Sequence, residues 1–311
     1  MSEVLGGLVA PFADIGSNPS FFAEVLIGGV AAGLMYSLVA LGFVLIFKAS
    51  GVFNFAQGVM VLFAALTLVG LIERGAPVAV ALLLTVGVMV LLAFAIERVV
   101  LRPLVNQEHI ILFMATIGLN FFLEGFGEML WGANVKRLDV GIPDTSFKIG
   151  NVLVNRLELT AAITAAVLVT VLAVFFQKTA IGRALRAVAD DHEAALSLGI
   201  PLRTIWTVVW SVAGLVAIVA GIMWGAKSGV QFSLSLIALK ALPVLILGGF
   251  TSVPGAIAGG LIIGVCEKIA EVYWGPLVGG AIENWFAYVL ALAFLLFRPQ
   301  GLFGERIIER V

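Results

Sequence analysis

A stripe of polar side chains in an apolar segment is the feature of this sequence best suited to chemistry. Asn120 and Glu124 stand four residues apart, Thr116 precedes them by the same step, and Glu128 follows. This spacing places all four side chains on one face of a helix. A carboxylate and an amide there could line a solute path by charge and hydrogen bonding, or they could pack against another helix. For Glu128, the structural interpretation is favoured.

Three more polar side chains lie beside or within apolar runs. Asn54 and Gln57 occur in the segment GVFNFAQG, where they could line a solute path or cap the start of a helix. Lys240 lies inside a later run, and a lone charge at the centre of a membrane helix costs about 2.5–3.5 kcal/mol. A buried carboxylate would offset this cost. Glu267 and its charged neighbours are instead expected to reach the outer headgroups.

Patterns of enzymatic catalysis and metal binding do not stand out in the sequence. His109 and His192 have no partner at metal-ligand spacing, and no G-x-S-x-G occurs. The segment 221–228 is the nearest approach to a P-loop, but Ala226 replaces the required glycine and no strand precedes it. We therefore expect neither an enzyme nor a cofactor-binding chain, and any ATP hydrolysis should occur on another chain.

The composition is that of a membrane protein. Of the 311 residues, 61% are hydrophobic and 12% are charged, whereas soluble domains carry about 25% charged residues. So few charges cannot cover the surface of a soluble protein of this length. The net charge of -1 argues against a nucleic-acid partner. The lone cysteine, Cys266, cannot form an internal disulfide.

The apolar runs predict an all-α bundle in one domain, 1–311. A spanning helix needs about 20 apolar residues to cross roughly 30 Å of hydrocarbon. One run is short enough to be a half-helix or a re-entrant segment, so we expect eight or nine transmembrane helices. The runs cover 21–47, 53–72, 77–100, 110–131, 159–176, 204–226, 236–250 (the short one), 256–274 and 282–297.

The distribution of basic residues predicts the orientation. With the N-terminus outside, ten of the 18 Lys and Arg residues fall in cytoplasmic loops, six fall outside and two lie within the membrane. This bias favours an outer N-terminus and a cytoplasmic C-terminus. The loop 132–158 is then extracytoplasmic, and the highly charged loop 177–203 is cytoplasmic.

The cytoplasmic loop is expected to contain a short amphipathic helix. Residues 181–198 are rich in good helix formers. Gly199 is placed to end this helix, and Pro201 prevents its continuation. Its apolar face would comprise Ile181, Leu185, Val188, Ala195 and Leu198.

The two halves of the chain contain a weak internal repeat. The segments 41–66 and 242–264 both contain an apolar run, a short Gly/Ser hinge and a second apolar run. Paired interrupted helices point to a transporter site, although any two helical hairpins can look alike. Gly260 and Gly264 form a G-x-x-x-G, a spacing that lets a neighbouring helix approach closely.

The cytoplasmic loop carries a resemblance to a known family. Glu193, Ala194, Ala195 and Gly199 form EAA-x-x-x-G, which resembles the coupling loop of bacterial ABC importer permeases. Four blocks in order resemble the branched-chain amino acid permease family, LivH type, and the resemblance extends from about residue 25 to 304. These blocks are GVFNFAQG (51–58), GRALRAVADDHEAALSLGI (182–200), LGGFTSVPGAIAGGLIIG (247–264) and FRPQGLFG (297–304).

The resemblance implies a type II ABC importer-like permease fold in a bacterial inner membrane. It also implies a second similar permease, two cytoplasmic ATPase subunits and an extracytoplasmic solute-binding protein as partners. The implied ATPase-coupling residues are Arg183, Arg186, Glu193, Ala194, Ala195 and Gly199. The candidate pathway residues remain Asn54, Gln57, Asn120, Glu124 and Lys240.

Substrate and transport class stay open at this point. The family usually has a histidine and an acidic residue in the first block, where this chain has Gln57 and Val59. Urea and short-chain amide importers are similar relatives. An ion-coupled secondary transporter is a rival that would use a buried carboxylate such as Glu124 or Glu267. An intramembrane enzyme and a purely structural subunit are weaker alternatives.

Overall fold

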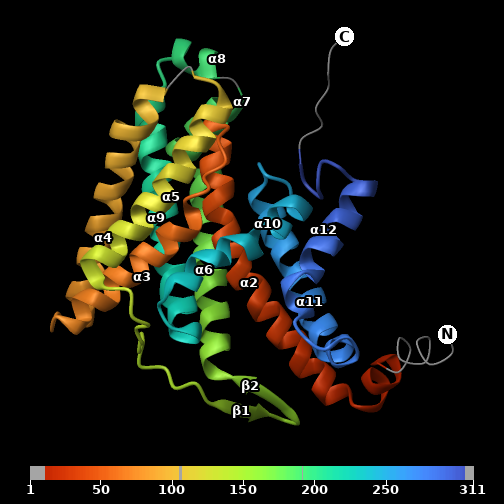
Figure 1. The fold of residues 1–311 in the computed structure, drawn as a ribbon. Helices are drawn as coiled ribbons and strands as arrows, with labels where there is room; N and C mark the ends of the chain where they lie inside the picture. The colour runs from red at the N-terminus through yellow and green to blue at the C-terminus, as the bar shows by residue number, and fades with distance from the viewer. Residues whose placement is uncertain (1–10, 105–106, 191, 305–311) are drawn as a thin grey trace.

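The computed structural model describes residues 11–104, 107–190 and 192–304, and most of them are helical (Figure 1). Helix α4 (Val78–Ala95) continues as a π-helical turn, η1 (Ile96–Leu101), and then as a 3-10 turn, η2 (Arg102–Leu104). Two further 3-10 turns are η3 (Phe232–Leu236) and η4 (Ile282–Asn284). The main helices are α2 (Pro19–Ser50), α3 (Gln57–Glu73), α4 (Val78–Ala95), α5 (His109–Trp131), α6 (Arg156–Lys178), α7 (Ala180–Asp190), α8 (His192–Ser197), α9 (Leu202–Ser228), α10 (Ile237–Gly248), α11 (Val253–Val278) and α12 (Phe286–Phe297).

The predicted all-α membrane bundle is confirmed. Six helices of the described residues are long and apolar enough to cross a membrane, and three shorter apolar helices accompany them. Each predicted run contains one of these helices. Two helices are shorter than their runs, because the run 53–72 becomes helical only at Gln57 and the run 282–297 forms α12 only from Phe286. The short run 236–250 forms the 12-residue helix α10.

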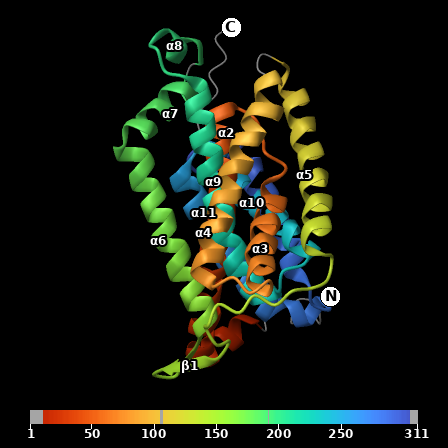
Figure 2. The same cartoon turned by 90° about the vertical axis from the view of Figure 1, so that its left-hand side faces the viewer.

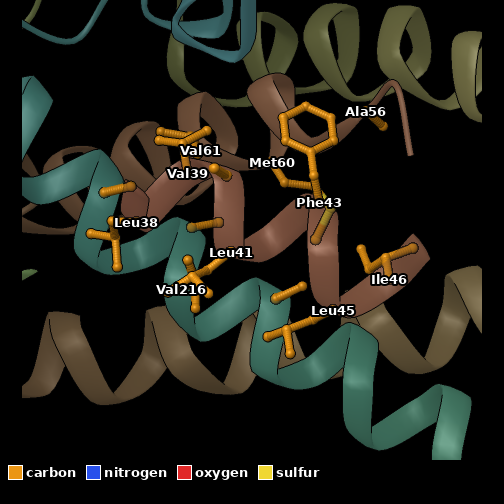
Figure 3. Close-up of a cluster of buried hydrophobic side chains, with 14 of the residues drawn as sticks. Leu38, Val39, Leu41, Phe43, Leu45, Ile46, Ala56, Met60, Val61 and Val216 are labelled. Atoms are coloured by element: carbon orange, nitrogen blue, oxygen red, sulfur yellow. The ribbon is translucent and has the colours of Figure 1, made fainter. Parts of the chain in front are cut away.

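Helix α2 is the centre of the bundle. Its residues from Met35 to Ile46 are buried without interruption, as expected for a helix that is apolar on every side. It packs against α6, α9 and α11. In the buried cluster, Leu41 lies beside Val216 of α9, and Phe43 lies beside Met60 of α3 (Figure 3).

Helices α2 and α11 approach each other through glycines. A Cβ atom added to Gly33 would lie 2.5 Å from the carbonyl oxygen of Gly260 and 2.9 Å from the Cα of Leu261. A Cβ atom added to Gly264 would collide with the backbone of Gly33. The G-x-x-x-G prediction of a close neighbour is therefore confirmed, and that neighbour is α2.

The two long loops lie at opposite ends of the bundle. Loop 132–158 contains the antiparallel hairpin of β1 (Ser146–Ile149) and β2 (Val152–Asn155). Helices α7 and α8 lie at the other end (Figures 1 and 2). This arrangement agrees with one outer and one cytoplasmic loop. The assignment of one of these ends to the cytoplasm remains a prediction.

Two helices begin inside the bundle instead of at its ends. After α2, residues 51–56 turn back along it, and the side chain of Gln57 packs against Gly42. Gly42 precedes Ser50 by eight residues, which corresponds to about 12 Å along an α-helix. The carbonyl of Ser235 packs against Gly58, so α10 starts at the same level as α3. From this level the two helices run toward opposite ends (Figure 1).

Candidate functional site

A cavity of about 260 Å³ lies at the level where α3 and α10 begin. This partly open cavity is bordered by α2, the irregular segment 51–56, α5, η3 and the first turns of α10. Its lining is mostly aromatic and aliphatic, with three polar side chains. The lining residues are Phe43, Phe53, Phe55, Asn120, Phe121, Glu124, Phe232, Ser235, Leu236, Ala238, Leu239 and Leu242.

The segment between α2 and α3 builds the aromatic wall of this cavity. The rings of Phe43 and Phe53 stack with centroids 4.8 Å apart, and Phe55 meets Phe53 edge-on at 6.4 Å. The hydroxyl of Thr116 holds the irregular backbone in place. It accepts a hydrogen bond from the amide of Phe55 at 3.1 Å and lies 3.3 Å from the carbonyl oxygen of Phe53. The predicted polar stripe thus begins with a positioning residue.

Asn120 and Glu124 bring the polar groups of α5 to the same cavity. Within the described part of the chain, neither side chain has a hydrogen-bond partner, and Glu124 forms no ion pair. A carboxylate among apolar surroundings is unfavourable unless water or a partner reaches it. The cavity supplies that access. The two residues therefore face one cavity, and their assignment to a solute pathway remains a prediction.

Asn54 and Gln57 do not line the cavity. Both side chains are completely buried. The Oδ1 atom of Asn54 accepts a hydrogen bond from the amide of Ala56 at 3.1 Å, and its Nδ2 atom lies 3.4 Å from Oε1 of Gln57. Asn54 thus stabilises the turn that precedes α3, but it is not the N-cap considered as the structural alternative, because Ala56 holds that position. Their assignment to the pathway remains a prediction.

Lys240 lies within a buried polar cluster away from Glu124. Its Nζ atom is 3.1 Å from Oε1 of Glu267, which also accepts a hydrogen bond from Tyr36 at 2.8 Å. Lys240 also donates to the carbonyl of Glu283. The expectation that Glu267 reaches the outer headgroups was wrong, because its side chain is buried and compensates Lys240. Lys240 also lines a second cavity, of about 220 Å³, beside Trp224.

Arg183 and Arg186 stabilise the junction between α6 and α7. Arg186 donates to the carbonyl oxygens of Phe176 at 2.6 Å and Gln177 at 3.3 Å, and Arg183 donates to that of Lys178 at 3.2 Å. These carbonyls belong to the last turn of α6, where they lack helical partners and attract cations. Both arginines join the loop helix α7 to the membrane helix before it.

The stretch expected to be helical at 181–198 is helical on both sides of residue 191, as α7 and α8. Residue 191 lies outside the described residues, as do the side chains of Glu193 and Ala194. Gly199 ends α8 as predicted, with a φ of 81°. The Ile200 amide donates to the carbonyl of Ala195 at 3.0 Å, which is the 6→1 bond of a Schellman motif.

The tip of this loop exposes apolar side chains, and one of them was predicted to lie on the apolar face of the loop helix. Leu185, Val188 and Ala195 are buried as expected. Leu198 was expected on the same face, but 78% of it is exposed, and its neighbour Leu196 is 52% exposed. Leu198 follows the last residue of α8, so a helical period no longer decides its direction. Leu196, Leu198 and Gly199 form the exposed tip.

Comparison with known proteins decides the family. Residues 25–298 match the profile of a family described as the branched-chain amino acid transport system permease component. The chain belongs to this permease family. Its polytopic helical architecture and its nearly full-length match make it a membrane-embedded transport permease, as the resemblance of the four sequence blocks implies.

Individual relatives agree with this assignment. The permease is 30% identical to the high-affinity branched-chain amino acid transport system permease protein LivH of Salmonella typhimurium, over 94% of this chain and 98% of that protein. BraD of Pseudomonas aeruginosa, a permease protein of the same description, is 27% identical over 93% and 98%. A probable LivH of Methanocaldococcus jannaschii is 28% identical over 90% and 92%.

One solved structure gives a lower similarity. PsaBC from Streptococcus pneumoniae in complex with Fab aligns with 93% of this chain and 94% of its own, at 15% identity and a TM-score of 0.44. This similarity lies below the level that establishes a shared fold.

Proposed function

We propose that this permease is one membrane subunit of an ATP-driven importer that carries branched-chain amino acids. The observation that carries this proposal is the family match over residues 25–298. By the same reasoning, its partners are a second similar permease, two cytoplasmic ATPase subunits and an extracytoplasmic solute-binding protein. The chain itself does not hydrolyse ATP.

The cavity at the level of α3 and α10 supports the choice of substrate. Discontinuous helices that meet near the middle of a membrane form the solute sites of many transporters. Here such a site has an apolar wall of phenylalanine and leucine side chains. This wall suits the side chains of branched-chain amino acids better than urea or a small amide, the related substrates that remain alternatives.

The exposed tip of the cytoplasmic loop supports ATPase docking. Leu196 and Leu198 offer apolar contact area, and no atom of the described residues lies within 4 Å of a Cβ added to Gly199. Arg186 ties α7 to the end of α6, and α9 begins directly after the tip. A displacement of the loop would therefore move both attached spans, as alternating access requires.

The same assignment orients the permease in a bacterial inner membrane. The end with α7 and α8 faces the cytoplasm, together with the C-terminus. The end with the β1–β2 hairpin and the start of α2 faces outward, where loop 132–158 would meet the solute-binding protein. The excess of basic residues in loops at the cytoplasmic end supports this orientation.

Substitutions at Gly199 test the docking role. Gly199→Trp places a large side chain on the exposed tip and is expected to abolish leucine uptake by the assembled importer, with normal membrane insertion. Gly199→Ala is the matched control, because any side chain at a φ of 81° brings the same strain of about 1–2 kcal/mol, but alanine adds little bulk. It should retain most uptake.

The measurements are ATPase co-purification with each variant and initial rates of radiolabelled leucine uptake. Normal uptake by Gly199→Trp would contradict docking at this tip.

A further inference from the structure

We propose that the cavity between α5 and α10 binds the amino acid in transit as a zwitterion. In this site Glu124 binds the α-ammonium group, Asn120 binds the α-carboxylate, and the aromatic and aliphatic wall holds the apolar side chain. The inference rests on the proposed function and names the residues that recognise the substrate.

The charge of the cavity selects a cationic group. Glu124 is the sole ionisable side chain in the cavity lining as described. Lys240 of the neighbouring helix α10 is bound to Glu267. A carboxylate at this depth gains from a cation that arrives with the solute, and a charge-assisted N–H···O bond is the strongest contact available to it.

The second polar group of α5 complements the first. Asn120 and Glu124 are four residues apart, so their Cβ atoms are about 5–6 Å apart on one face of the helix. The amide of Asn120 can donate to a carboxylate without neutralising Glu124. The hydroxyl of Ser235 donates to the carbonyl of Phe232 at 2.8 Å. Asn120 is therefore the free donor suited to the substrate carboxylate.

The remaining lining suits an aliphatic body. Phe43 and Phe53 form a stacked pair in the lining, and Leu239 and Leu242 of α10 also line the cavity. The volume of about 260 Å³ lies slightly below the range of about 300–1,000 Å³ for drug-sized ligands, as a site for a smaller solute would. A small apolar amino acid fits this combination of size, single charge and apolar wall.

The test compares three glutamate variants in the complete importer. The permease is purified with its ATPase, second permease and solute-binding protein, and uptake of radiolabelled leucine is measured in proteoliposomes loaded with ATP. Glu124→Gln keeps the shape but removes the charge, and it is expected to lower uptake about tenfold or more. Glu124→Asp keeps the charge and should retain clearly more uptake than Glu124→Gln.

Glu128→Gln is the matched control, because Glu128 lies one turn further along α5 and outside the cavity lining. It should transport within about twofold of wild type. Co-purification of the partners and basal ATPase activity verify that each variant assembles. These two readouts separate a lost substrate contact from misfolding.

Three outcomes would overturn the site. They are uptake by Glu124→Gln within twofold of wild type, equal losses in Glu124→Gln and Glu124→Asp, and an equal loss in Glu128→Gln. A wild-type importer that transports no leucine would instead contradict the proposed function. The failure of the site and the failure of the function are therefore distinguishable.

Discussion

At the scale of single residues, the cluster of Tyr36, Lys240 and Glu267 joins α2, α10 and α11. Oε1 of Glu267 is shared by the Tyr36 hydroxyl and the Lys240 ammonium group, at 2.8 and 3.1 Å. The Glu267 residue is only 4% exposed. Charges in such surroundings are tolerated when they are paired and hydrogen-bonded. The cluster therefore stabilises the start of α10, which forms part of the cavity lined by Asn120 and Glu124.

Removal of one member of this cluster should destabilise the permease. Lys240→Met leaves Glu267 without its counter-charge, and loss of one partner from a buried ion pair costs about 3–5 kcal/mol. The melting temperature in detergent should fall markedly, and the double variant Lys240→Met/Glu267→Leu should recover much of the loss.

Lys227→Met is the control, because Lys227 pairs with Glu158 at 2.8 Å on a more exposed surface, where a pair contributes only about 0–1 kcal/mol. Equal melting temperatures for Lys240→Met and Lys227→Met would show that the buried pair is not structural.

At the scale of elements, the glycine contact between α2 and α11 positions the central helix. Gly29 and Gly33 of α2 face the backbone of α11 near Gly260 and Gly264. Small residues let membrane helices approach closely, so that backbone packing replaces side-chain packing. Since α2 also lines the cavity between α5 and α10 through Phe43, this contact influences that cavity through the placement of α2.

A single methyl group should disrupt this contact. Gly264→Ala would place its Cβ atom against the backbone of Gly33, and overpacking of this kind typically costs about 1–3 kcal/mol. Gly87→Ala on α4 is the matched control, because within the described part of the chain no atom lies within 4 Å of the added Cβ, and alanine favours a helix interior over glycine by about 1 kcal/mol.

Thermal unfolding in detergent should show a lower midpoint for Gly264→Ala and an unchanged or higher one for Gly87→Ala. The reverse order would contradict the close approach of α2 and α11.

The helices were more predictable from the sequence than the places where they begin. Apolar length is a local property, so each span was found within a few residues. The start of α3 at Gln57 depends on Gly42 and Thr116, which belong to other elements. Likewise, the partner of Lys240 lies 27 residues away in sequence. Such tertiary contacts leave no periodic signal in a single sequence.

The candidate site was only partly predictable for the same reason. The four-residue spacing of Asn120 and Glu124 is a helical property, and the structure brings both to one cavity. Asn54 and Gln57 carry the same kind of polar groups, but the return of segment 51–56 along α2 buries them in a turn. The aromatic wall had no sequence signal, because Phe43, Phe53 and Phe55 resemble ordinary membrane-facing residues until the chain is folded.

At the scale of the whole molecule, three of the sequence blocks that carry the family resemblance reach the same end of the bundle. The tail segment 297–304 binds the end of α10, through hydrogen bonds from the amides of Leu302 and Phe303 to the carbonyls of Leu247 and Gly248 at 2.8 and 3.1 Å. Helices α7 and α8 lie at the same end (Figure 1). The location of these sequence blocks at one end of the bundle is consistent with the binding of ATPase subunits there.

Dependence of transport on ATP hydrolysis by a partner is the central expectation for the whole molecule. The measurement is leucine uptake into proteoliposomes that contain the complete importer, with ATP inside, and with either wild-type ATPase subunits or subunits unable to hydrolyse ATP. We expect leucine to accumulate only with ATP and active ATPase subunits, and the permease alone to accumulate none. Ion-driven accumulation of leucine by the permease alone, without ATP, would contradict this function and identify a secondary transporter.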